Sequence, residues 1–191
     1  RVREELDQLP SPRVALGHGI GGSIVLEMLQ STANGTDGVI LHAPVGARLD
    51  RRLFPKLMAI PGMRWLGRQV FSSAPARPFL RRLLFRGPVP ANYLRRFFRE
   101  YRSCQVFSQM FDLITAEWFS RLEPVDVPAR LLWGGRERVL ATSHVEAFER
   151  LLPRARVRVI EDWDHFPMID APADYAREIA ALAKGLVEDS P

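Results

Sequence analysis

Four short apolar runs, separated by segments with helical spacing, dominate the pattern of hydrophobic and polar positions along the chain. Each run is nearly continuous rather than alternating, which is typical of strands buried on both faces of a parallel sheet. The runs are residues 13–16, 39–42, 130–133 and 157–160. Apolar positions three and four residues apart predict helices over residues 1–9, 23–30, 142–152 and 171–187. This alternation indicates an α/β fold with an open, mostly parallel sheet flanked by helices.

The segment between the second and third runs is too long for a simple crossover. Residues 45–122 carry Leu, Phe and Trp at helical spacing, interleaved with arginines and broken by prolines. Short amphipathic helices of this kind pack one apolar face on a neighbour and keep their charged groups in water. We therefore expect an α/β core formed by residues 1–44 and 123–191, with an arginine-rich helical cap or lid inserted at residues 45–122.

The positive charge of the chain is concentrated in the predicted cap. The whole sequence has a formal net charge of +5, but residues 48–102 carry thirteen arginines and one lysine against two acidic residues. A basic block of this size forms either a solvated face or a site for an anionic partner. We favour the solvated face and keep contact with a membrane surface as the alternative. We expect no nucleic acid, because the sequence lacks the pattern of a nucleic-acid-binding module.

Composition excludes several other classes of protein. With 191 residues, 47% of them hydrophobic and 26% charged, the chain has a globular rather than a disordered or fibrous composition. Its apolar runs are much shorter than the roughly 18 residues that a membrane-spanning helix needs. Cys104 is the only cysteine, which excludes an internal disulfide and a cysteine-built metal site. We expect a cytoplasmic protein, and the high Arg, Ala and Leu content is typical of a GC-rich bacterial genome.

A glycine-rich turn follows the first apolar run. Residues 17–22 read Gly-His-Gly-Ile-Gly-Gly and lie between a predicted strand and a predicted helix. The glycines do not have the spacing of a dinucleotide-binding loop, and the turn lacks the lysine of a phosphate-binding loop. The acidic residues and the histidine of residues 137–165 likewise lack a metal-ligand spacing such as His-x-x-x-His. We therefore expect no cofactor and no metal.

Three segments resemble the α/β-hydrolase superfamily, in particular its cap-bearing, esterase- and lipase-like members. The turn Gly17-His-Gly-Ile-Gly21 resembles the family's nucleophile elbow, a G-x-S-x-G turn between a strand and a helix. Residues 131–137 are similar to the segment that supplies the acid of a catalytic triad, and residues 159–168 to the segment that supplies its histidine. The three occur in the family's order and together span nearly the whole chain. The resemblance implies an apolar carboxylic ester or acyl substrate.

The resemblance also assigns catalytic roles to individual residues. His165 would be the general base, and Glu137 would orient its imidazole. Asp162 and Asp164 are nearby rival acids, and the sequence does not choose among the three. The backbone amide of Ile20, just after the elbow, would be one donor of an oxyanion hole.

Glycine occupies the nucleophile position of the elbow. Gly19 has no side chain, so it cannot attack a carbonyl or carry an acyl group, although it tolerates the strained backbone of such a turn. Ser23 lies four residues further on, where its side chain would point along the predicted helix rather than out of the turn. We interpret His18 and His42 as structural residues that pack around the elbow and the second strand.

Three functions are compatible with these residues. The first is hydrolysis of an apolar carboxylic ester, the family's activity, with His165 acting on a bound water in place of a serine. The second is a pseudoenzyme that binds a small apolar ester-like ligand without turnover. The third is a module that acts on a partner or a membrane surface through its basic cap. Because function depends on the site, the fold does not choose among them.

The first apolar run has no predicted strand before it. The family's sheet has strands that precede the elbow strand, whereas this chain begins with Arg1 rather than with methionine. Without a neighbour, residues 13–16 would form an exposed parallel edge, which is prone to pair with other chains. We therefore expect upstream strands of the same protein, or a partner chain, to cover this edge.

Overall fold

A parallel sheet of four strands, in the order β1-β2-β3-β4, organises the computed structural model, which describes residues 2–31, 35–85, 87–104 and 106–188. The strands are β1 (Val14–His18), β2 (Gly38–His42), β3 (Ala129–Gly134) and β4 (Ala155–Ile160). Each predicted run falls on one strand, with ends that differ by at most two residues. The register pairs His18 with His42, and Gly134 with Ile160, so the carboxyl ends of neighbouring strands meet at one edge. The predicted α/β fold class is confirmed.

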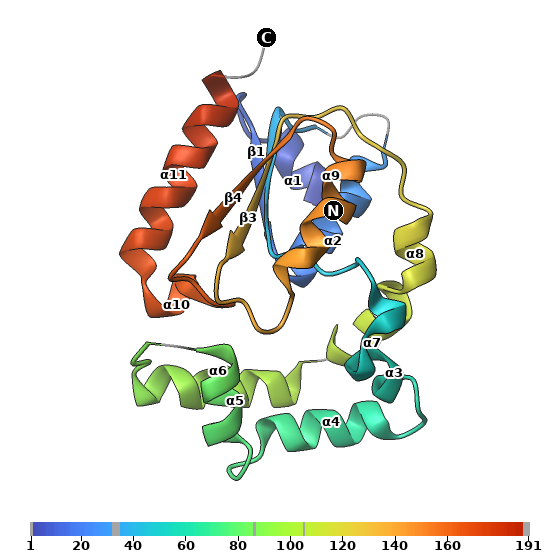
Figure 1. Ribbon diagram of the computed structural model, residues 1–191, viewed down its shortest axis with the longest axis vertical. Coiled ribbons are helices and arrows are strands. Elements are labelled where there is room, and N and C mark those ends of the chain that lie inside the picture. Colours follow the sequence, from blue (N-terminus) through green and yellow to red (C-terminus); the bar gives the residue numbers. More distant parts are fainter. Residues whose placement is uncertain (1, 32–34, 86, 105, 189–191) are drawn as a thin grey trace.

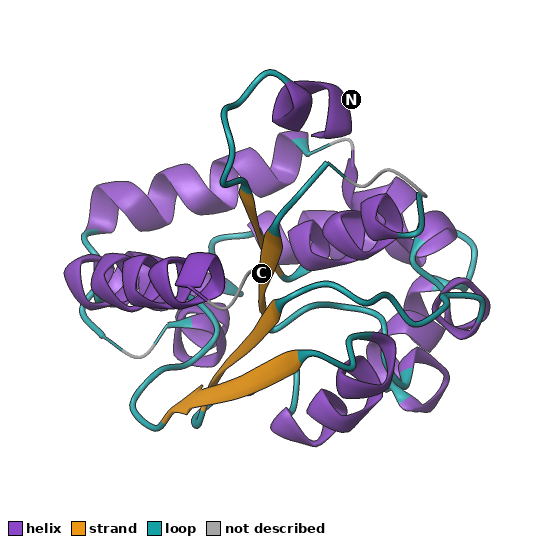
Figure 2. Cartoon of the chain, turned by 90° about the horizontal axis from the view of Figure 1, so that it is seen from above, coloured by secondary structure: helices purple, strands orange, loops and turns teal. Residues whose placement is uncertain are grey.

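Helices cover both faces of this sheet (Figures 1 and 2). Helix α11 lies against β2 and β3 on one face, and α2 packs on β1 and β2 on the other. The helices outside the segment between β2 and β3 are α1 (Val2–Asp7), α2 (Ile20–Leu29), α9 (Val145–Leu151), α10 (Pro167–Asp170) and α11 (Pro172–Glu188). Helix α2 begins three residues earlier than predicted, directly after Gly19, and a short 3-10 turn, η2 (Thr142–His144), precedes α9.

The main hydrophobic core lies on the side of the sheet that carries α2 and α9. All residues of β2 and β3 are buried, which explains why these two strands read as continuous apolar runs. Trp133 is fully buried against Phe148 of α9, and its indole nitrogen donates a hydrogen bond to the carbonyl of Leu140 at 2.8 Å. This bond fixes the loop that follows β3, the loop on which Glu137 is carried.

The first strand forms one edge of the sheet. Among the described residues β1 pairs with β2 alone, and the side chain of Leu16 on this strand is exposed. An exposed apolar edge is a template for strand pairing. A strand that covers this edge, from the same protein or from a partner, stays a prediction.

The segment between β2 and β3 forms helices, most of which lie beyond the carboxyl ends of the strands (Figure 1). They are η1 (Leu49–Arg51), α3 (Leu53–Met58), α4 (Met63–Ser72), α5 (Arg77–Leu84), α6 (Ala91–Ser103), α7 (Val106–Leu113) and α8 (Ala116–Ser120). A second apolar cluster of Leu80, Leu84, Phe85, Val89 and Phe98 holds α5 and α6 together. We call residues 45–122 the cap; its status as a separate domain stays a prediction.

Candidate active site

The glycine-rich turn forms a sharp corner between β1 and α2. Gly19 has φ 54° and ψ −117°, a backbone conformation that a residue with a side chain rarely adopts. Close packing of the strand on the helix requires glycine two residues earlier, because a Cβ on Gly17 would lie 2.6 Å from the carbonyl oxygen of Gly21. A Cβ on Gly19, in contrast, would meet nothing within 4 Å. The corner therefore has the shape of an elbow that presents residue 19 to open space.

Two further groups at this corner decide what it can do chemically. Ser23 is only 2% exposed, and its hydroxyl donates a hydrogen bond to the carbonyl of Val45 at 2.7 Å, so it is a structural residue. Ile20 is the first residue of α2, and the first N–H groups of a helix have no acceptor within the helix. The Ile20 amide lies at the positive end of the helix dipole and can donate to a developing oxyanion.

His165 and Glu137 form a hydrogen-bonded pair. Nδ1 of His165 lies 2.7 Å from Oε2 of Glu137, whose side chain is fully buried. The other carboxylate oxygen accepts hydrogen bonds from the amides of Val139, at 2.6 Å, and Leu140, at 3.0 Å. Since the carboxylate accepts a hydrogen bond from Nδ1–H, Nε2 of His165 is the nitrogen that can act as a base.

The electrostatics of this pair favour an ionised Glu137. Burial opposes ionisation, but the hydrogen bond and charge of His165, with the amides of Leu140 and Val139, outweigh it and lower the pKa of Glu137 below its ordinary value. The carboxylate is therefore charged at neutral pH and stabilises an imidazolium beside it.

The two rival acids have other partners. Asp162 is largely exposed and forms an ion pair with Arg136 at 2.5 Å. Asp164 is buried and accepts a hydrogen bond from the amide of Phe166 at 3.2 Å. The structure thus brings Glu137, and not Asp162 or Asp164, to the His165 ring.

Asp164 supplies a prediction for the pH dependence of stability. Burial, with a smaller effect of the Asp170 charge, raises the pKa of Asp164 to about 6. The folded state therefore holds this proton more tightly than the unfolded state, and ionisation of Asp164 lowers stability as the pH rises from about 4 to about 6. We expect Asp164→Asn, which keeps an acceptor for the Phe166 amide, to raise the Tm above about pH 7. Thermal unfolding across this pH range measures the difference, which should vanish near pH 4; equal Tm values above pH 7 would contradict it.

Two further histidines pack behind the pair. The His18 ring lies 4.7 Å from the rings of both His165 and His42, and its Nε2 lies 2.9 Å from the carbonyl oxygen of His165. Burial, followed by the charge of His165, lowers the pKa of His18 to about 4. His42 is completely buried, its ring nitrogens have no hydrogen-bond partner among the described residues, and burial lowers its pKa further. Both are neutral at neutral pH and contribute packing to the site.

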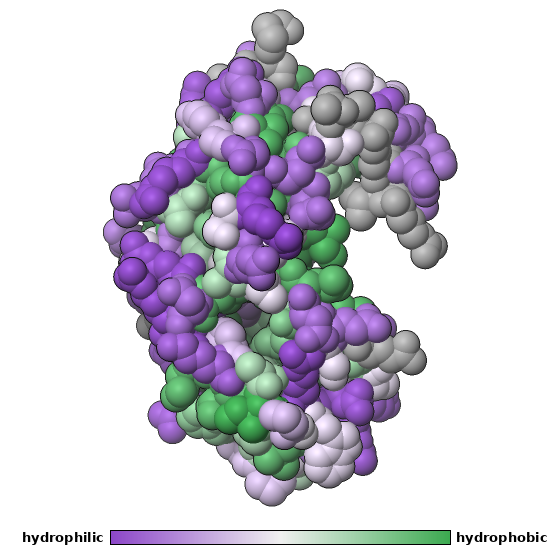
Figure 3. Space-filling model, turned by 90° about the vertical axis from the view of Figure 1, so that its right-hand side faces the viewer, coloured by the Kyte–Doolittle hydropathy of each residue, from purple (hydrophilic) through white to green (hydrophobic). Residues whose placement is uncertain are grey.

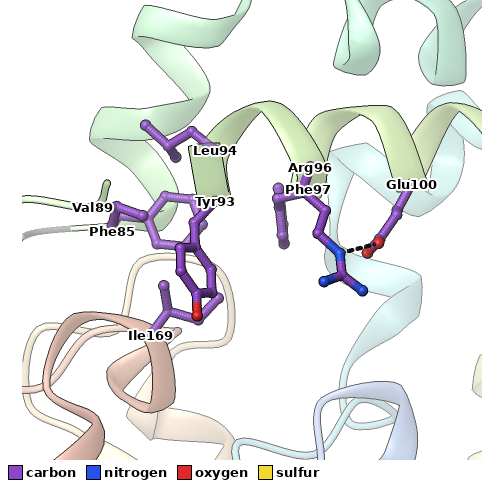
Figure 4. A pocket seen from close by; sticks show the side chains of 8 residues that line it. All are labelled: Phe85, Val89, Tyr93, Leu94, Arg96, Phe97, Glu100 and Ile169. Carbon is purple, nitrogen blue, oxygen red and sulfur yellow. Dashed lines mark hydrogen bonds and ion pairs between the residues drawn. The ribbon is translucent and has the colours of Figure 1, made fainter. Parts of the chain in front are cut away.

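An apolar cavity lies next to this site, between the cap and α10 (Figure 4). It has a volume of about 230 Å³ and is lined by Phe85, Val89, Tyr93, Leu94, Arg96, Phe97, Glu100 and Ile169. Phe166 separates the cavity from the histidine: its ring lies 4.5 Å from that of His165 and 5.3 Å from that of Phe85. The cavity can hold an apolar group of a ligand whose polar end reaches the histidine.

Metal chemistry finds no support in the part of the chain that the structure describes. No group of three or more His, Cys, Asp or Glu side chains is arranged there to hold a metal ion. His165 can transfer a proton, and the Ile20 amide can donate a hydrogen bond to a carbonyl oxygen.

A parallel sheet with a sharp glycine corner, and with a histidine–carboxylate pair at the carboxyl ends of its strands, is the architecture of an α/β hydrolase. The profile of the alpha/beta hydrolase family matches residues 1–178. The chain therefore belongs to this family, which confirms the resemblance found in the sequence.

Individual relatives are similar over part of their length. A protein of Acinetobacter baumannii AYE, assigned as a lipase, superimposes with a TM-score of 0.71 at 21% identity, covering 92% of this chain and 61% of that one. An epoxide hydrolase of Bacillus megaterium gives a TM-score of 0.62 at 14% identity, with 96% and 73% covered. Lipase 3 of Moraxella sp. (strain TA144) is 30% identical over 61 residues, 32% of this chain and 19% of the lipase. The chain thus spans less than two thirds of the Acinetobacter protein, and less of the Moraxella lipase.

Proposed function

We propose that this chain binds an apolar carboxylic ester or a related acyl ligand beside the Glu137–His165 pair and does not form an acyl-enzyme. One observation carries the proposal: the elbow retains its backbone shape, its base and an oxyanion donor, while Gly19 offers no nucleophile. Loss of the nucleophile removes covalent catalysis but leaves the groups that recognise a carbonyl.

The ligand class is supported by the surroundings of the pair. The cavity beyond Phe166 is mostly apolar, and its rim carries an ion pair in which Arg96 donates to Glu100 at 2.6 Å. An acyl chain would occupy the apolar part, and its carbonyl would lie near the amide of Ile20. The names of the similar proteins, a lipase among them, indicate the same class of ligand.

Slow hydrolysis through water is the second candidate function. The orientation of His165 by Glu137 leaves Nε2 available to take a proton from a bound water. This route lacks an acyl-enzyme intermediate, so its rate would be far below that of a serine esterase.

Ester hydrolysis by the chain as it stands tests these two candidates against each other. With p-nitrophenyl butyrate and octanoate we expect no burst, and a rate equal to that of His165→Ala within about twofold. Binding is measured with p-nitrophenyl octyl ether, which cannot be hydrolysed and should raise the Tm of the protein. Val89→Phe, which fills the cavity, should reduce this shift.

Each outcome of these measurements decides a separate point. Turnover that is lost in His165→Ala would replace the binding proposal by the water route. The absence of any Tm shift with the ether would contradict binding of an apolar ligand. A Tm shift that Val89→Phe leaves unchanged would place the ligand outside the cavity.

A further inference from the structure

The outer surface of the cap exposes large apolar side chains. Trp65 is 61% exposed, and Leu66 and Val70 are exposed beside it on the solvent side of α4. The opposite side of this helix faces the cap interior, where the Phe71 ring lies 4.3 Å from that of Tyr101 on α6. Helix α4 therefore has an apolar inner side and an apolar outer side, and only the inner side is covered.

The segment before α4 continues the exposed apolar surface. Leu53, Phe54 and Leu57 of α3 are exposed, as is Ile60 in the turn between the helices. Figure 3 shows apolar side chains gathered at the lower end of the molecule, where Figure 1 places α3 and α4. Apolar surface of this kind on a folded protein marks a site of interaction.

Arginines accompany the exposed aromatic residues. Trp65 and Phe79, which is 69% exposed, are each followed three residues later on the same helix by an arginine, Arg68 and Arg82. Residues three apart lie on the same side of a helix, so each arginine follows its aromatic residue along one side; Arg82 is exposed, whereas Arg68 is half-buried.

A second group of cap arginines faces water without a counter-charge. Arg95, Arg99 and Arg102 lie along one side of α6, at positions i, i+4 and i+7, and all three are exposed. None of them has an ion-pair partner among the described residues, although Arg96 of the same helix pairs with Glu100. The cap thus presents uncompensated positive charge as well as apolar groups.

We propose that the apolar outer surface of α3 and α4, together with the exposed cap arginines Arg82, Arg95, Arg99 and Arg102, binds the surface of a membrane that contains anionic lipids. Tryptophan and aliphatic side chains enter the boundary between headgroups and acyl chains, and guanidinium groups pair with lipid phosphates. No helix in the described ranges is both long and apolar enough to cross a bilayer, so the cap would lie on the membrane.

The positive charge of the cap favours an anionic membrane over a second copy of the chain as the partner of this surface. Residues 48–102 carry thirteen arginines and one lysine against two acidic residues, so two caps placed face to face would bring like charges together. An anionic membrane complements both the charge and the apolar side chains. The proposal concerns the cap surface alone and does not depend on turnover at the Glu137–His165 pair.

Vesicle flotation with intrinsic fluorescence tests the proposal. Vesicles of phosphatidylcholine with about 30% phosphatidylglycerol are compared with pure phosphatidylcholine, at about 0.05 M and about 0.5 M NaCl. We expect the full chain to float with the anionic vesicles at low salt, and its binding to fall about tenfold or more at high salt or with neutral lipid. Trp133 and Trp163 are buried and Trp118 is half-buried, so a blue shift of the emission on binding reports mainly on Trp65.

Matched variants locate the binding surface. Trp65→Gln combined with Leu66→Gln should lower the bound fraction in flotation about tenfold. Val187→Gln changes a side chain of α11 that is 40% exposed, close to the 43% of Leu66, and should bind like the unaltered chain. Failure to float with anionic vesicles at low salt, or equal binding by the double variant, would overturn the proposal. A dimer that the double variant dissociates in sedimentation would assign the surface to a second copy and would overturn it as well.

Discussion

Gly19→Ser is expected to create an esterase. A Cβ at this position meets nothing within 4 Å, so the hydroxyl can occupy the space in front of the elbow without displacing a neighbour. The base that would activate it is already oriented, because Nδ1 of His165 is held by Glu137 at 2.7 Å. The Ile20 amide supplies one oxyanion donor. We expect kcat/KM for p-nitrophenyl butyrate to rise by at least about 100-fold over the unaltered chain.

The same substitution is expected to lower stability. Gly19 has a φ of 54°, and a side chain in this part of conformational space costs about 1–3 kcal/mol. Thermal unfolding of Gly19→Ser should therefore show a reduced Tm while activity appears. A gain of activity together with a lower Tm would show that the serine restores the catalytic elbow. A better-folded protein would instead show a higher Tm.

Two double variants test whether the new activity uses the histidine pair. Gly19→Ser combined with His165→Ala should return the rate to that of the unaltered chain, because the serine would lose its base. Gly19→Ser combined with Glu137→Gln should lose most of the gain, since the imidazole would lose its orienting carboxylate. Activity that persists in the His165→Ala background would contradict the assignment of His165. A folded but inactive Gly19→Ser protein would show that the elbow, His165 and the Ile20 amide are together insufficient in this chain.

The sheet could be predicted from the sequence because its central strands are buried on both faces. Residues 39–42 and 130–133 are nearly continuous apolar runs, interrupted only by His42 and Arg130, and the structure places them inside β2 and β3 with every residue buried. The start of α2 was harder to predict, since the glycines of residues 19–22 have low helix propensity. Packing explains the early start: a Cβ on Gly17 would lie 2.6 Å from the carbonyl oxygen of Gly21, and a Cβ on Gly22 would lie 2.6 Å from the Cβ of Pro44.

The acid partner of His165 could not be chosen from the sequence. Glu137, Asp162 and Asp164 all lie on loops near the histidine, and their spacing along the chain does not fix their direction. The structure separates them through contacts that leave no sequence signal, above all the amides of Val139 and Leu140, which hold the Glu137 carboxylate. Phe166 was also missed as a site residue, although its place directly after the histidine was the available signal.

The exposed apolar face of α4 shows a further limit of sequence patterns. The spacing predicts amphipathic helices in the cap, with apolar groups inward and arginines in water. Phe71 and Phe98 follow this rule, but Trp65 and Leu66 point outward. A periodic pattern identifies faces, and only the packing of one helix on another decides which apolar face remains uncovered.

Gly134→Ala is expected to cause the largest loss of stability among single substitutions at the site. Gly134 ends β3, and a Cβ there would lie 2.6 Å from the carbonyl carbon of Trp163 and 2.9 Å from the carbonyl oxygen of Asp164. Both atoms belong to the backbone, so neither can move aside as a side-chain end could. We expect a loss of about 3 kcal/mol or more in the free energy of unfolding, measured by denaturant titration.

The close approach at Gly134 also holds the histidine pair together. The loops that carry Glu137 and His165 leave neighbouring strands at this point, and the amide of Arg136 donates to the carbonyl of Trp163 at 2.9 Å. In the Gly19→Ser background, Gly134→Ala should therefore remove activity as well as stability, because the loops would move apart. Gly21→Ala is the matched control: its Cβ would meet nothing within 4 Å, and within α2 it should keep or raise stability by up to about 1 kcal/mol. Equal stability of the two alanine variants would show that the chain relaxes around Gly134, and that backbone contact there does not set the geometry of the site.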